Sequence, residues 1–175
     1  MSGLAQDSTG QPAHRVFPGT RTSLVLGFGN VLLSDDGAGV QVVARLRSQP
    51  GAAVANLLDA GTLSFSLLPY IEVADSLLVI DAADINRAAG TVNLYEGAVM
   101  DAFLMSTRRR SVHEVGIIDL LDMARLSDCL PLRRALLCIQ PGRIDWSEQL
   151  SAPVAAALPE AASQAAALLN RWQNS

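Results

Sequence analysis

The sequence predicts a single α/β domain in three layers, with a twisted, mostly parallel sheet of about five strands flanked by helices on both faces. Two observations carry this fold class. Short runs of consecutive apolar residues, typical of strands covered on both faces, alternate with segments whose apolar residues repeat at helical spacing. The chain of 175 residues, half of them hydrophobic and 17% charged, can also bury a substantial core in one domain.

The expected elements follow one another with short links. Three apolar runs predict buried strands, at residues 23–28, 76–81 and 135–139, and residues 53–58 form a further apolar run between the first two. Residues 91–95 alternate more weakly and predict an edge or antiparallel strand. Apolar residues gathered on one side predict helices at residues 39–47, 63–71, 115–126 and 161–172, and Pro69 stands near the expected end of the second of them.

Composition and charge exclude several classes of protein. The formal net charge is −4, so no global basic field is available for nucleic acid, and the one basic run, Arg108 to Arg110, predicts a solvated loop. Cys129 and Cys138 match no zinc or redox motif, which favours a reducing compartment. No apolar run reaches the roughly 18 residues of a membrane span.

The beginning of the chain differs from the rest. Residues 1–20 are rich in Gly, Ser, Gln and Pro and lack the apolar core of a signal peptide, so we expect a flexible extension before a domain at residues 21–175. We therefore expect a cytoplasmic protein that binds neither nucleic acid nor membrane. Because no exposed apolar stripe stands out, we also expect a monomer.

The most informative segment is residues 24–39, LVLGFGNVLLSDDGAG, in which a strand leads through a glycine turn and two acids into a helix. It resembles a dinucleotide-binding loop, but Leu32 occupies the place of the third glycine. Asp35 and Asp36 would also repel a pyrophosphate bound at the helix N-terminus. A nucleotide-binding oxidoreductase is therefore the less favoured alternative, and we expect no organic cofactor.

Four aspartates and one histidine stand at the ends of expected strands and helices, although their spacing alone does not bring them together. One of the adjacent acids Asp35 and Asp36 suits a helix N-cap, which leaves the other to point elsewhere. Asp81 closes the clearest strand, at the carboxyl edge of the sheet, and Asp59 competes with it for the same role. His113 comes just before a helix, and two carboxylates with one imidazole suit an open Zn or Ni site.

Several motifs, in the same order, resemble those of the [NiFe] hydrogenase maturation endopeptidases. The similarity begins with residues 27–40, GFGNVLLSDDGAGV, and covers roughly residues 24–157. The further matches are DAGT at 59–62, VIDA at 79–82, SVHEVG at 111–116 and IQP at 139–141. Residues 140–151 look most like members that serve NAD-reducing, bidirectional-type hydrogenases.

The resemblance implies an endopeptidase that removes a short C-terminal peptide from the hydrogenase large-subunit precursor after nickel has been inserted. The implied metal-contacting residues are Asp36, Asp81 and His113, and the nickel is supplied by the precursor as the recognition signal. The family often has glutamate at the first of these positions, so the shorter Asp36 draws its carboxylate back by about one C–C bond. Asp35 is then expected to cap the helix.

Two accounts of the cleavage step remain open, and both make Asp36 and Asp81 the expected catalytic residues. In the first, the nickel polarises the scissile carbonyl or a water while a carboxylate accepts the proton. In the second, the two acids share a proton as in aspartic proteases, the type implied for this family. A non-catalytic nickel-state sensor or maturation chaperone would use the same three residues.

Overall fold

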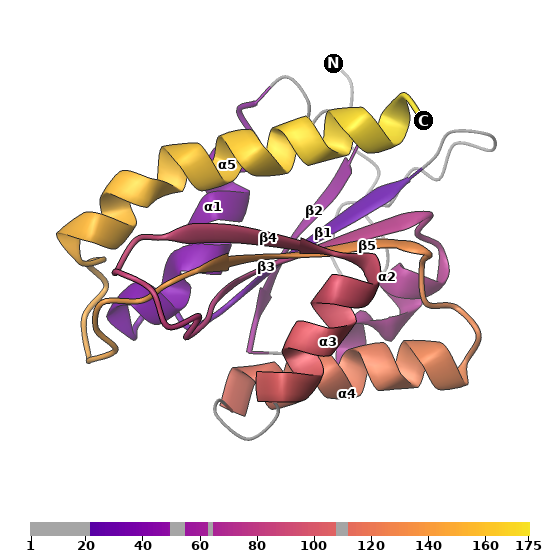
Figure 1. The fold of residues 1–175 in the computed structure, drawn as a ribbon, viewed down its shortest axis with the longest axis horizontal. Coiled ribbons are helices and arrows are strands. Elements are labelled where there is room, and N and C mark those ends of the chain that lie inside the picture. The colour runs from indigo at the N-terminus through magenta and orange to yellow at the C-terminus, as the bar shows by residue number, and fades with distance from the viewer. Residues whose placement is uncertain (1–21, 50–54, 63–64, 108–111) are drawn as a thin grey trace, which may run out of the picture.

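The computed structural model describes residues 22–49, 55–62, 65–107 and 112–175, and it shows a five-stranded sheet between two layers of helices (Figure 1). The strand order is β2-β1-β3-β5-β4. Neighbouring strands are parallel except for the edge pair β4 and β5, which is antiparallel. The strands are β1 (Ser23–Phe28), β2 (Ala55–Gly61), β3 (Ser76–Ala82), β4 (Val92–Glu96) and β5 (Arg133–Ile139). The predicted fold class is confirmed.

Helices cover both faces of the sheet, and each face has its own apolar core (Figure 1). One layer contains α1 (Ala38–Leu46) and α5 (Ala152–Gln173), and the other contains α2 (Leu68–Glu72), α3 (Gly97–Thr107) and α4 (Val112–Leu126). Two short 3-10 helices, η1 (Ser34–Gly37) and η3 (Phe65–Leu67), precede α1 and α2. No helix in the described part of the chain combines the length and apolar character needed to cross a membrane.

The helices differ from the sequence expectation more than the strands do. Helix α3 was not predicted, because apolar residues occupy most of its positions and mark no single face. Helix α5 begins nine residues before the expected 161, since Pro153 lies in its first turn, where a missing N–H costs no hydrogen bond, and it continues through Pro159. Pro69 likewise lies in the first turn of α2 and not near its end.

Helix α1 lies against the sheet at Gly39. A Cβ atom at this position would overlap the carbonyl oxygens of Phe28, at the end of β1, and of Ile80, near the end of β3. Glycine therefore allows the helix to approach both strand ends, and the preceding η1 is brought into contact with β3.

Replacement of Gly39 by alanine tests this close approach. Helix propensity alone predicts that Gly39→Ala stabilises the protein by up to about 1 kcal/mol. The overlap predicts the opposite sign, a loss of about 1–3 kcal/mol in the free energy of unfolding. Urea denaturation measures the difference, and Ala44→Gly on the exposed side of α1 serves as a control for propensity. A stabilised Gly39→Ala variant would contradict the packing described here.

Candidate functional site

The turn after β1 holds the carboxylate of Asp36. Gly29 adopts a φ of 122°, and its backbone lies against that of Asp36 so closely that a side chain would not fit. The amide of Asn30 donates a 2.7 Å hydrogen bond to Oδ2 of Asp36, whose residue is buried at 6% exposure. The glycine turn therefore orients an acidic side chain, and one of its amides is already used for this purpose.

Asp81 is buried at the carboxyl end of β3, as predicted. Strand β3 pairs with β1 in parallel, so both strands end at the same edge of the sheet. The chain crosses to opposite sides of β1 at this point, to β2 and to β3, which is where ligands bind in open α/β sheets. Because η1 contacts β3, the fold brings the segment that carries Asp36 to the strand end that carries Asp81.

His113 lies in the first turn of α4, which begins at Val112, and not in a loop before the helix as expected. The structure describes the backbone at this position but not the side chains of residues 112–115. Among the side chains that are described, no three His, Cys, Asp or Glu gather closely enough to hold a metal ion. The convergence of His113 with Asp36 and Asp81 stays a prediction, and the basic run from Arg108 to Arg110 lies outside the described residues.

Asp59, the competitor of Asp81, lies near the end of β2 and is exposed. Its Oδ1 accepts a 2.9 Å hydrogen bond from the amide of Gly61. It lines a cleft of about 230 Å³ beside the glycine turn, together with Gly29, Asn30, Val31, Val40, Gly61 and Thr62. Asp59 thus faces open space beside the edge strand β2, whereas Asp81 is buried near the carboxyl end of the central strand β3.

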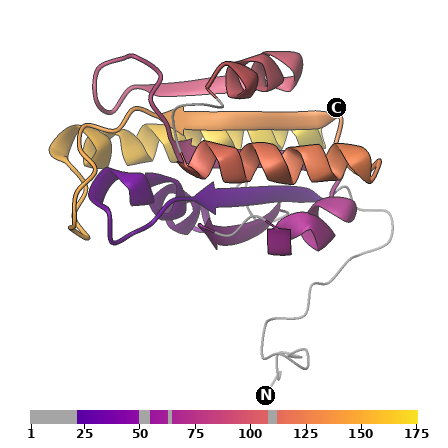
Figure 2. The ribbon, with the colours of Figure 1, turned by 90° about the horizontal axis from the view of Figure 1, so that it is seen from below.

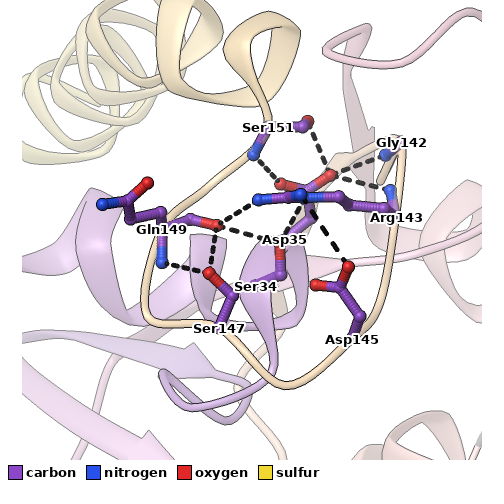
Figure 3. A network of polar contacts seen from close by, with 8 residues as sticks. All are labelled: Ser34, Asp35, Gly142, Arg143, Asp145, Ser147, Gln149 and Ser151. Carbon is purple, nitrogen blue, oxygen red and sulfur yellow. Dashed lines mark hydrogen bonds and ion pairs between the residues drawn. The ribbon is translucent and has the colours of Figure 1, made fainter.

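Asp35 does not cap a helix, so that expectation was wrong. Neither η1 nor α1, both fully described, has a side-chain hydrogen bond at its N-cap. The fully buried Asp35 carboxylate instead accepts four hydrogen bonds from the segment between β5 and α5 (Figure 3). Its Oδ2 accepts from the amides of Gly142 (2.8 Å) and Arg143 (3.0 Å) and from Oγ of Ser151 (2.7 Å), and its Oδ1 accepts from the amide of Ser151 (2.6 Å).

These contacts decide the protonation of Asp35. Burial alone would raise the pKa of this carboxyl, but the hydrogen bonds from the side chain and amide of Ser151 and from the amides of Arg143 and Gly142 outweigh it and hold the pKa below its ordinary value. Asp35 is therefore ionised at neutral pH, and four donors lie around its negative charge.

Ser34 adds a second connection between the same two segments. Its Oγ donates to the carbonyl of Gln149 (2.9 Å) and accepts from Nε of Arg143 (3.1 Å), as Figure 3 shows. Its amide donates to the carbonyl of Ser147 at 2.6 Å, and the amide of Ser147 donates to the carbonyl of Leu32 at 3.0 Å. Figure 2 shows the loops after β1 and β5 side by side at one end of the sheet. Sequence reasoning missed this pairing, because its partners are more than a hundred positions apart.

Gln140, in the IQP motif, supports the loop that follows Asp81. Its Oε1 accepts hydrogen bonds from the backbone amides of Ile85 (2.9 Å) and Arg87 (3.2 Å), and the backbone N–H of Gln140 donates to the carbonyl of Thr91 at 2.9 Å. This motif residue therefore has a structural role beside the site.

The Asp35 network predicts a pH-dependent loss of stability on substitution. Asp35→Asn replaces an acceptor by an amide that faces four donors, so we expect a loss of about 3 kcal/mol in the free energy of unfolding at pH 7. A lowered folded-state pKa means that the unfolded state binds the proton more readily. The contribution of the ionised Asp35 carboxylate to the free energy of unfolding is thus complete above the unfolded-state pKa of about 4. It disappears as pH falls through the lower pKa of the folded state.

Denaturant unfolding at several pH values measures this difference. The difference in free energy of unfolding between wild type and Asp35→Asn is expected to decrease as pH falls below about 4. Asp145→Asn, at an exposed acid of the same loop, is the control and is expected to change stability by no more than about 0.5 kcal/mol. A gap that stays constant across this range would contradict the assignment.

Comparisons with known proteins identify the family to which the chain belongs. The model of the hydrogenase maturation protease family matches residues 40–168. The hydrogenase expression/formation protein HupD of Rhodobacter capsulatus is 37% identical over 152 residues, which are 85% of this chain and 71% of the relative. The hydrogenase 2 maturation protease of Escherichia coli is 30% identical over 150 residues, 83% of this chain and 89% of the relative.

Solved structures extend the similarity to three dimensions. The hydrogenase maturating endopeptidase HybD from E. coli superposes with a TM-score of 0.78 at 29% identity, over 87% of this chain and 93% of that one. The [NiFe] hydrogenase maturation protease HybD from Thermococcus kodakarensis gives a TM-score of 0.71 at 27% identity, over 86% of this chain and 99% of that one. By its fold and by these relatives, the chain belongs to the hydrogenase maturation protease family, whose members are endopeptidases.

Proposed function

We propose that this protein is a cytoplasmic, monomeric endopeptidase that removes the C-terminal peptide of a nickel-loaded [NiFe] hydrogenase large-subunit precursor. The observation that carries the proposal is the pair of buried carboxylates, Asp36 and Asp81, on segments brought together at the carboxyl ends of the sheet strands. We expect such a pair, in a member of this family, to recognise a metal-bearing polypeptide.

The donor set fits nickel that arrives with the substrate. The Asn30 amide orients the Asp36 carboxylate, and burial strengthens the attraction of both carboxylates for a cation. With the imidazole of His113 as third ligand, two oxygens and one nitrogen leave positions open for ligands that the nickel brings from the precursor.

For the cleavage step we favour the metal-assisted account over the aspartic dyad. Carboxylates that hold a cation stay ionised, which opposes the shared proton that a dyad needs. One of the two carboxylates, Asp36 or Asp81, then accepts the proton of the attacking water and passes it to the amine that leaves as the peptide bond breaks, which returns the carboxylate to its ionised form. The type of hydrogenase served stays a prediction from the resemblance of residues 140–151.

A nucleotide-binding oxidoreductase finds no support in the turn. The amide of Asn30, one of the groups that would bind a phosphate at this place, already donates to Asp36. The carboxylate thus occupies the position of the anion, and family membership points to a protease.

The decisive experiment mixes the purified protein with nickel-loaded precursor and, separately, with nickel-free precursor, and determines the intact masses of the products. We expect a C-terminal peptide to be lost from the loaded precursor alone. Binding of the loaded precursor without any change in mass would instead identify a sensor or chaperone. Equal cleavage of both precursors would overturn the role of nickel as recognition signal and favour the dyad.

Substitutions test the three assigned residues. Asp36→Asn, Asp81→Asn and His113→Ala are each expected to slow precursor processing by at least about 100-fold, because each removes a ligand or proton acceptor. Asp36→Glu, which keeps the carboxylate and matches the residue common in the family, is expected to retain processing.

The control is Asp84→Asn, which neutralises an exposed acid just after β3 and is expected to process at the wild-type rate. Denaturant unfolding of every variant separates loss of chemistry from loss of fold. Normal processing by a folded Asp36→Asn or His113→Ala protein would sink the assignment of that residue.

A further inference from the structure

Four large hydrophobic side chains are exposed on the two loops beside the candidate site. Trp146 is 82% exposed and Ile144 57%, on the loop after β5, while Leu32 is 46% exposed and Val31 41%, on the loop after β1. We call these four residues the apolar surface. The other exposed large hydrophobics of the described residues lie away from these loops, at Val73, Val99, Met105, Leu126 and Leu132.

The backbone places the two halves of the apolar surface next to each other. Leu33 and Ser147 form a parallel β-bridge, which sets Leu32 beside Trp146. The amide of Ser147 donates to the carbonyl of Leu32, and the amide of Ser34 donates to the carbonyl of Ser147. Because the two loops lie side by side at one end of the sheet (Figure 2), their four exposed hydrophobic residues gather at that end.

This surface is held in place from beneath. Asp35 and Ser34 bind the segment from Gly142 to Ser151 through partly buried hydrogen bonds (Figure 3). The side chain of Asn30 accepts from the amide of Leu32 at 3.0 Å and tightens the other loop. A preorganised surface loses little conformational entropy on binding, and tryptophan is the residue type that most often dominates the energy of protein interfaces.

The apolar surface adjoins the cleft beside Asp36, and this position indicates what binds there. Val31 belongs to the apolar surface and also lines the cleft, beside Asn30, whose amide holds Asp36. A protein seated on this surface would lie next to Asp36. Arg143 and Asp145, exposed and 3.8 Å apart, supply the polar border typical of an interface.

We infer that the apolar surface is where the folded body of the large-subunit precursor docks, through an apolar patch of its own that borders the C-terminal peptide. This inference rests on the proposed function. It separates binding, which the apolar surface provides, from chemistry, which Asp36 and Asp81 provide.

The test compares steady-state processing of nickel-loaded precursor by the wild type and by the double variant Leu32→Ser/Trp146→Ala. We expect the KM to rise at least about tenfold while kcat stays within about twofold, since docking and not the reacting groups is altered. The matched control is Leu126→Ser/Leu132→Ser, which removes side chains that are 87% and 91% exposed away from the site and is expected to keep the wild-type KM.

The outcomes separate this inference from the proposed function. A wild-type protein that leaves the loaded precursor intact overturns the proposed function, and with it the inference. Wild-type cleavage together with an unchanged KM in the folded double variant overturns the inference alone, as does a fall in kcat without a rise in KM. Sedimentation that shows a wild-type dimer and a monomeric double variant would assign the surface to a second copy of this chain and also overturn the inference.

Discussion

The buried carboxylate of Asp35 is the interaction on which the rest of the site depends. It accepts four hydrogen bonds from a segment that begins more than a hundred residues later, and so joins the loop after β1 to the connection between β5 and α5. A buried charge is tolerated only when it is fully hydrogen-bonded, and the lowered pKa of Asp35 reflects that condition. Because Asp36 is the next residue, the same contacts also limit where the site carboxylate can lie.

The two adjacent acids thus bind different parts of the structure. Asp35 faces the β5–α5 connection, while Asp36 accepts from Asn30 in the turn after β1. The tight 3-10 geometry of η1 sends successive side chains in different directions, which allows Asp35 to support the structure while Asp36 lies in the candidate site. The same support underlies the exposed Trp146 and Leu32, so the loops that surround the site form one ordered unit.

Much of the fold was predictable because its signals are local. Consecutive apolar residues marked the buried strands, weak alternation marked β4 as the antiparallel edge, and the position of Asp81 after an apolar run placed it at the carboxyl end of β3. Helix α3 was missed because its apolar residues form no stripe, and the starts of α2 and α5 were misplaced because proline in a first turn was not recognised as a favourable position. The motifs indicated the family, which the relatives confirm.

The sequence by itself determined the fold class, the family and the edge of the sheet at which Asp36 and Asp81 lie, since these follow from periodicity and from motif order. Only the tertiary structure decided which groups bind the structural acid, Asp35. The sequence favoured a helix cap for Asp35, a local role, but the donors that satisfy its buried charge come from Gly142, Arg143 and Ser151. The pairing of Leu32 with Trp146 was equally hidden. Contacts between distant segments leave no periodic signal, because they depend on how the sheet brings its loops together.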